Sequence, residues 1–205
     1  LLMLGININA QNTAGKSALA EAVIAGKYEI AKNLLESDAD PNICDSTGVT
    51  ILMDSIRGNN VDDVALLLEY GANPNVQEIN GRNSYHEAAY SGNKDIIRLI
   101  RDAGGDPLSR DKQGNTPFSI VLNKNIDIIK EVLGTKYTIT DSDGNTPVHI
   151  VVRNKVSGNL LRFLISAGYP IDTRNSSGYT PLSYAIEMND VKTAEILLEH
   201  RSEER

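Results

Sequence analysis

The sequence is poor in the residues that cross-link secreted proteins and in those that bind nucleic acids. Its 205 residues include one cysteine, Cys44, and no tryptophan, and the net charge is −7. A single cysteine rules out an intrachain disulfide framework and suits a reducing compartment, so we expect a cytoplasmic protein; cysteine-poor periplasmic or host-cell-delivered proteins share this composition. Because phosphate contacts need concentrated Lys and Arg, we expect no nucleic-acid partner.

Long hydrophobic runs are also missing. The longest apolar stretches, such as residues 150–152, are far shorter than the roughly 20 residues that cross a bilayer, so we expect no membrane span. Residues 1–5 are apolar, but they lack the basic flank and the small-residue cleavage site of a signal peptide.

Glycines, in contrast, recur at an almost fixed spacing along the whole chain. They are 33, 33, 33, 30 and 34 residues apart, at Gly15, Gly48, Gly81, Gly114, Gly144 and Gly178. A period of about 33 residues is typical of stacked-repeat proteins. We therefore expect residues 1–205 to form one elongated repeat domain without a single central core.

The local chemistry around each glycine predicts a turn followed by a helix. In residues 111–118 an Asp precedes the glycine by three positions, and Thr116-Pro117 follows it. Glycine accepts the positive φ of a tight turn, and an Asp side chain can bond the turn backbone. A Thr at the helix N-cap and a Pro at the first helical position then start a helix.

Each unit continues with two short apolar patterns at helical spacing, separated by a polar loop. The predicted repeats are residues 11–42, 43–75, 76–108, 109–138, 139–172 and 173–205, preceded by residues 1–10 as the end of a truncated repeat. We expect that the protein extends upstream of this fragment. The spacing shortens by three residues before Gly144 and gains one in the next unit, so the fourth and fifth repeats should meet irregularly.

These motifs resemble the ankyrin repeat family. Residues 178–185 read Gly-Tyr-Thr-Pro-Leu-Ser-Tyr-Ala, and residues 71–75 read Gly-Ala-Asn-Pro-Asn, close to the family's two signatures. The resemblance covers nearly the whole chain and implies an all-α ankyrin-repeat solenoid with short hairpin-like turns. It also implies that His86 and His149 bond the backbone of the neighbouring turn. Asp63 and Arg101 depart from the family's apolar pattern, so we expect each to be partly exposed or to find a partner.

No constellation in the sequence predicts catalysis, a metal or a cofactor. Residues 141–145 resemble the start of a calcium loop, but the twelfth position is Val152, where bidentate Glu would be required. A nucleophile elbow and a phosphate loop are both missing, and the repeat that contains Cys44 has no histidine. We therefore expect a non-catalytic protein without cofactors.

The remaining candidates are surface side chains of the turns and first helices, which in this family line a concave face. The partner-binding candidates are Ile79, Arg82, Glu87, Tyr90, Lys112, Lys124, Arg153, Tyr179, Tyr184 and Met188. Aromatic and arginine side chains most often anchor interfaces, although at each single position simple exposure to water is the more common situation. Arg82, Lys112, Lys124 and Arg153 would form a basic strip, for which an acidic protein segment is the natural partner.

The resemblance thus implies a monomeric scaffold that binds a protein partner through its concave face and turn tips. Two other interpretations remain open. The first alternative is the targeting part of a larger enzyme or effector whose catalytic domain lies elsewhere. The second is a structural spacer or a module that captures a small ligand or anion.

Overall fold

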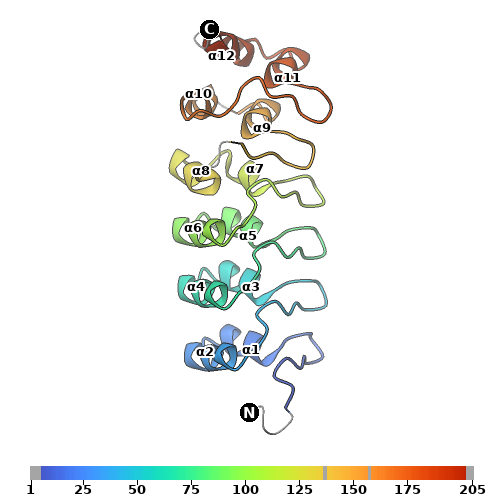
Figure 1. Ribbon diagram of the computed structural model, residues 1–205, viewed down its shortest axis with the longest axis vertical. Coiled ribbons are helices and arrows are strands. Elements are labelled where there is room, and N and C mark those ends of the chain that lie inside the picture. The colour runs from blue at the N-terminus through green and yellow to red at the C-terminus, as the bar shows by residue number, and fades with distance from the viewer. Residues whose placement is uncertain (1–5, 136–137, 157, 202–205) are drawn as a thin grey trace.

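The computed structural model describes residues 6–135, 138–156 and 158–201. In this part of the chain the helices stack into an elongated molecule with the termini at opposite ends (Figure 1). The first helix of every pair lies in one column and the second helix in another, and the connecting turns project to one side. This arrangement is all-α, as the sequence predicts; isolated bridges such as Cys44 with Thr50 are the only β pairings among the described residues.

Each predicted repeat range contains one helix pair, and the exact repeat boundaries stay a prediction. The first helices are α1 (Ala18–Ile24), α3 (Ile51–Arg57), α5 (Ser84–Ser91), α7 (Pro117–Val121), α9 (Pro147–Arg153) and α11 (Pro181–Glu187). The second helices are α2 (Tyr28–Glu36), α4 (Val61–Glu69), α6 (Lys94–Asp102), α8 (Ile126–Leu133), α10 (Gly158–Ser166) and α12 (Val191–Arg201).

A capping side chain begins every first helix. Thr116, Thr146 and Thr180 accept a backbone hydrogen bond from the third helical residue, and proline follows each of them. The caps of the earlier repeats, Ser17, Thr50 and Asn83, do the same without the proline. One such cap contributes about 1 kcal/mol, so the short helices are anchored at their starts.

The turns before the first helices share one hydrogen-bonding pattern. Asp111 Oδ1 accepts from the backbone N–H groups of Gln113 and Asn115 at 2.9 and 2.8 Å. Asp45, Asp141 and Asn175 make the equivalent pairs in their own turns. The turn glycines have φ between 75° and 83°, a left-handed conformation that glycine adopts without steric cost.

Hydrophobic side chains fill the space within and between helix pairs. Leu67, Ile97 and Phe118 are completely buried, and so is Tyr85, whose hydroxyl donates to Val132 O at 2.6 Å. That bond joins α5 to α8, and it links the third repeat to the fourth. Side chains in this protein are therefore buried by contacts between neighbouring repeats. In stacked-repeat proteins the stability is approximately the sum of the contributions of single repeats and of the interfaces between neighbours.

Backbone hydrogen bonds between successive turn tips add a second link. Ile79 N donates to Thr47 O, and Lys112 N donates to Asn80 O, both at 2.8 Å. An asparagine ladder runs beside them: Asn9, Asn42 and Asn75 each accept from a backbone N–H of the following repeat. Asn9 makes the same contact as its equivalents in the next two repeats. That residues 1–10 end a truncated repeat stays a prediction, and residues 1–5 lie outside the described residues.

The fourth and fifth repeats are joined differently from the others. A Cβ built on Gly114 has no atom of the next turn within 4 Å, whereas one built on Gly81 lies 3.0 Å from Lys112 N. Within the described residues no backbone bond joins the turn at 111–115 to that at 141–145, and α7 and α9 pack more sparsely than any other adjacent first helices. Residues 136–137 and 157, part of the predicted irregularity, lie outside the description.

A side chain provides the link at this joint. Arg110 places Nε 3.2 Å from Asp141 Oδ2 and Nη1 2.6 Å from Asp143 Oδ2. The Asp141 side chain is 1% exposed, so the guanidinium of the fourth repeat reaches a buried carboxylate of the fifth. Arg110 thus links these two turns by its side chain, whereas backbone hydrogen bonds link the turns of the second and third, the third and fourth, and the fifth and sixth repeats.

Candidate functional site

The exposed face that combines turns and first helices is the candidate site. One position of this face lies four residues after each helix N-cap; we call the set the inner row. The inner row consists of Glu21, Asp54, Glu87, Ile120, Ile150 and Tyr184. It is acidic in the first three repeats and apolar or aromatic in the last three. Ile120 and Ile150 were absent from the sequence candidates, although their fixed distance from the cap is a signal that identifies them.

Two of the predicted candidates form a stacked pair at the C-terminal end. The rings of Tyr179 and Tyr184 lie 4.9 Å apart with an interplanar angle of 13°. Tyr184 is held further by Asn175, whose Nδ2 donates to its hydroxyl at 2.9 Å, and by the edge of the His149 ring at 6.0 Å. Tyr179 is 37% exposed, so an ordered aromatic surface faces solvent here. Met188, four residues after Tyr184, is the C-cap of α11 and is half-buried.

A second group lies on the third and fourth repeats. The Arg82 guanidinium sits over the Tyr90 ring, 5.1 Å from its centroid, and its Nε is 3.7 Å from the buried Asp111. Lys124 donates to Tyr90 O at 3.2 Å. Tyr90 is exposed, as is Ile79 at the preceding turn tip. The Arg82 guanidinium thus covers one face of the Tyr90 ring, while Lys124 holds the backbone carbonyl of the same residue. A side chain ordered before binding loses less entropy when a partner covers it.

Glu87 differs from its predicted exposure. Its side chain is 10% exposed and receives a hydrogen bond from Arg57 Nη2 at 2.9 Å. Because α3 and α5 pack closely, the arginine of one repeat covers the carboxylate of the next. Glu87 therefore lies below the accessible surface, and we leave it out of the interface proposed below.

The predicted basic strip is divided by these contacts. Arg82 faces Asp111 and Lys124 bonds a carbonyl group, while Lys112 and Arg153 are exposed to solvent. Arg153 lines a polar cleft of about 250 Å³ between the fourth and fifth repeats, together with Gln113 and Ser119. Lys112 and Arg153 are thus the members of the strip that these contacts leave exposed, and the strip as a binding surface stays a prediction.

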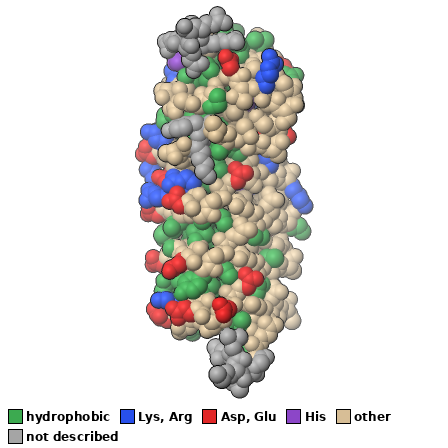
Figure 2. Space-filling view, viewed as in Figure 1, with side chains coloured by type: hydrophobic (Ala, Val, Ile, Leu, Met, Phe, Trp, Pro, Cys, Tyr) green, Lys and Arg blue, Asp and Glu red, His purple; other side chains and the backbone are tan. Residues whose placement is uncertain are grey.

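Ion pairs also occupy the opposite side of the stack. Blue and red side chains gather over α6 and α8 in Figure 2, where Arg98 and Arg101 both contact Glu131. Arg101 additionally pairs with Asp102 at 2.9 Å, so this departure from the apolar pattern finds partners, as expected. Burial alone would raise the pKa of Glu131, but hydrogen bonds from both arginines hold that pKa below its usual value.

A family model described as ankyrin repeats (3 copies) matches residues 1–78, 47–111 and 118–204. The chain belongs to the ankyrin repeat family. Solved ankyrin structures share its fold. The ankyrin repeat domain of Bcl-3, a member of the IkappaB protein family, is 20% identical with a TM-score of 0.70, and the match covers 91% of this chain and 86% of that one. The ankyrin repeat protein EF0377 is 21% identical with a TM-score of 0.65, covering 92% and 98%.

A third similar structure is a complex. A chain from the structure of the predatory endopeptidase Bd0816 of Bdellovibrio bacteriovorus with the immunity protein Bd3460 is 26% identical, with a TM-score of 0.62. The match covers 93% of this ankyrin chain and 99% of that chain. The two chains are thus similar over the whole repeat stack.

The two ankyrin histidines have the contacts that the resemblance implies. His86 Nε2 lies 3.2 Å from Asn115 O, and His149 Nε2 lies 3.0 Å from Tyr179 O. Both rings are buried, and burial lowers the pKa of both imidazoles. The equivalent residue of the fourth repeat, Ser119, bonds its own N-cap Thr116 instead, so this bridge is also missing at the irregular joint.

Ankyrin domains are in general non-catalytic interaction domains, and the polar side chains of this chain serve structural contacts. Asp141 and Asp143 of the calcium-like stretch bond the turn backbone and Arg110. Among the described residues no group of three side chains of the His, Cys, Asp or Glu types gathers as metal ligands would. No helix in the described ranges has the length and apolar character needed to cross a membrane.

Proposed function

We propose that this chain is a non-catalytic recognition module that binds one protein partner through its turns and first helices. The observation that carries the proposal is the Tyr179–Tyr184 stack, an exposed aromatic pair fixed by Asn175 and His149. Tyrosines of this kind are frequent anchors of protein interfaces because they supply large contact area at low entropic cost.

The apolar half of the inner row supports the same proposal. Ile120 and Tyr184 are half-buried, so together with Tyr179 they offer an apolar surface on the fourth and sixth repeats. Ile150 is buried like Glu87, and we leave it out as well. A partner of standard size would bury about 1,200–2,000 Å² in total. The Arg82–Tyr90 pair lies on the repeat before this surface and extends it.

The test is partner capture from the source cell with the wild-type chain and matched tyrosine variants. Tyr179→Ala should weaken capture at least about tenfold, because truncating an interface anchor costs roughly 1.4 kcal/mol or more. Tyr28→Ala is the control: Tyr28 is 41% exposed but begins the second helix α2. Equal capture by both variants would contradict the proposed face, and far-ultraviolet circular dichroism should show that both remain folded.

A second candidate function follows from the similarity to the endopeptidase–immunity protein complex. The 26% identity extends over 99% of the matched chain, which makes inhibition of a peptidase a specific form of partner binding worth testing. The chain at micromolar concentration should slow peptide hydrolysis by purified Bd0816. Unchanged hydrolysis at a hundredfold excess would remove this enzyme as a target and leave the recognition proposal in place.

A further inference from the structure

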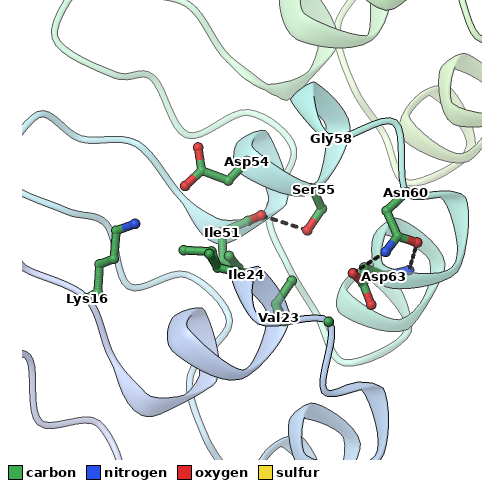
Figure 3. A pocket seen from close by; sticks show the side chains of 10 residues that line it. Lys16, Val23, Ile24, Ile51, Asp54, Ser55, Gly58, Asn60 and Asp63 are labelled. Carbon is green, nitrogen blue, oxygen red and sulfur yellow. Dashed lines mark hydrogen bonds between the residues drawn. The ribbon is translucent and has the colours of Figure 1, made fainter.

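The joint between the first and second repeats shows how one repeat is covered by the next. Figure 3 looks into a groove of about 410 Å³ at this joint, which Asp63 lines with its carboxylate bonded by Asn60. Val23 lines the same groove and points from α1 toward α3. This residue lies six positions after the N-cap Ser17 and is buried, since α3 packs against α1.

The same position is buried in each of the next four repeats and exposed in the sixth. Ile186 lies six residues after the N-cap Thr180 and is 67% exposed. Its buried equivalents are Ile56, Ala89, Leu122 and Val152. Leu182, two residues after the same N-cap, is only half-buried. The equivalents of Leu182 in the first five repeats are all buried: Leu19, Leu52, Tyr85, Phe118 and Val148.

The second helix of the sixth repeat is exposed in the same way. Leu198 is 51% exposed and lies eight residues after Asp190, which caps α12 by accepting from Thr193 N at 3.2 Å. Leu35 and Leu133, eight residues after the N-caps of α2 and α8, are buried. Because α11 and α12 lie at the C-terminal end of the stack (Figure 1), no described helix covers these side chains. We call the surface formed by Leu182, Ile186 and Leu198 the end face.

The first helix borders the end face with a charge opposite to that of the second repeat. Arg57 lies seven residues after its N-cap and binds Glu87 of the third repeat, with Nη2 2.9 Å from Oε1. The same position of the sixth repeat is Glu187, which is exposed and has no ion-pair partner among the described residues. A helix that covers the end face would thus meet a carboxylate where α5 meets a guanidinium.

The second helix shows the same reversal of charge. Arg98 and Lys130 lie five residues after their N-caps and contact the following repeat. Arg98 pairs with Glu131, and Lys130 lies over the Phe163 ring, 5.2 Å from its centroid. Glu195 occupies this position of the sixth repeat, is exposed, and likewise lacks an ion pair in the described part of the chain. The end face therefore has an apolar centre and an acidic border.

A second copy of this chain does not match that border. The first repeat of such a copy has Glu21 at the position of Glu87, so stacking on the end face would place it beside Glu187. At the position of Glu131, the first repeat has the uncharged Asn33. Neither position offers a cation, so the charges favour a different partner.

We propose that the end face binds a helical segment of a protein partner, whose apolar side chains are bordered by lysine or arginine. At every joint of the described stack the equivalent surface is covered by helices of the next repeat, so its shape suits a helix. Covering Ile186 and Leu198 removes apolar area from water, and basic residues beside it would pair with Glu187 and Glu195. The inference goes beyond the proposed function, because the end face does not include the Tyr179–Tyr184 stack.

Two synthetic peptides of about 18 residues, or five helical turns, test the inference. They share one leucine face; the basic peptide carries lysine on both borders of that face, and the acidic peptide carries glutamate there. Each is titrated into the folded chain, and backbone signals are followed by nuclear magnetic resonance. The signals of Leu182, Ile186 and Leu198 report on the end face.

The basic peptide should shift these three signals saturably, and the acidic peptide should bind at least about tenfold more weakly. Ile186→Ser should weaken binding of the basic peptide at least about tenfold, because the peptide no longer buries an isoleucine. Ile24→Ser is the matched control: Ile24 is also exposed, but it lies on α1 at the other end of the stack, so binding should not change.

A pair of double variants tests the charged border. Glu187→Lys combined with Glu195→Lys should reverse the preference, so that the acidic peptide binds more tightly than the basic one. Glu29→Lys combined with Glu36→Lys changes the net charge equally at exposed positions of α2, and this variant should keep the wild-type preference.

Two results would overturn the inference. One is the absence of saturable shifts at Leu182, Ile186 and Leu198 in the wild-type chain. The other is an equal effect of the two double variants, which would indicate attraction to net charge alone. Circular dichroism of each variant separates loss of binding from loss of folding. Because Tyr179 lies outside the end face, failure here would leave the partner-capture experiment unaffected.

Discussion

Arg110 joins the fourth repeat to two aspartates of the fifth, and replacing Arg110 with Gln should weaken the stack at that point. In the wild-type chain Arg110 contacts the buried Asp141 and the exposed Asp143. Glutamine is polar but shorter, and it removes the charge. Asp141 then retains three hydrogen bonds, from the backbone N–H groups of Asp143 and Asn145 and from Asn145 Nδ2.

The expected loss of stability depends on how far each carboxylate is buried, and only Asp141 is buried. Breaking a buried ion pair typically costs about 3–5 kcal/mol, because it leaves an uncompensated charge. The three remaining hydrogen bonds to Asp141 reduce that figure, so we expect about 2 kcal/mol from this pair. Asp143 has a side chain that is 55% exposed, and its pair should add less than about 0.5 kcal/mol.

Urea unfolding followed by circular dichroism measures the loss, and hydrogen exchange locates it. Because the fourth and fifth repeats share few other contacts, amides of α9 to α12 should exchange faster in Arg110→Gln than those of α1 to α6. Arg98→Gln is the matched control, because Arg98 is half exposed in its pair with Glu131 and its loss should cost much less stability than the loss of Arg110. Equal destabilisation by the two variants, or uniform exchange along the chain, would refute this reasoning.

Acid unfolding provides a related prediction. Burial would raise the pKa of Asp141, but the hydrogen bonds from Asn145 and Arg110 hold that pKa below its usual value of 3.8. The stability that ionised Asp141 contributes should therefore be complete above pH 3.8 and be lost as pH falls through the folded-state pKa, with a smaller loss in Arg110→Gln. Tyr85→Phe should lower stability by about 1–2 kcal/mol in thermal unfolding, because Val132 O loses a buried donor; an unchanged melting temperature would contradict the bond at 2.6 Å. Gly105→Ala should cost roughly 1–3 kcal/mol in urea unfolding, since its Cβ would lie 2.8 Å from Ile100 O, and a neutral effect would mean that the loop can shift freely. His149→Gln should flatten the pH dependence of stability between pH 7.5 and 5. Burial lowers the pKa of this imidazole from 6.5, so wild-type stability is complete above 6.5 and falls as the unfolded chain takes up protons; identical pH profiles would disprove this contribution.

The periodic features of the fold could be predicted from the sequence because each is encoded locally. The Thr-Pro pairs begin α7, α9 and α11 as expected, and the turn glycines have the positive φ that their context requires. These features depend on residues within one repeat. A single period of the sequence is therefore enough to predict them.

Features that depend on two repeats were harder to predict. Glu87 looks exposed within its own helix, but Arg57 of the preceding repeat covers it. Arg110 occupies an ordinary turn position, and its role appears only when the next turn places Asp141 beside it. Asp63 was identified as an exception to the apolar pattern, whereas the groove that it lines is formed together with α1.

The change along the inner row gives the molecule a direction. Its N-terminal half presents Glu21 and Asp54, and its C-terminal half presents Ile120 and Tyr184. An extended ligand bound along the stack can match both halves in one orientation only, with its cationic part at the first repeats. In the reversed orientation its apolar side chains would contact the carboxylates. The ankyrin stack should thus distinguish a peptide from its reversed sequence even where composition and length are identical.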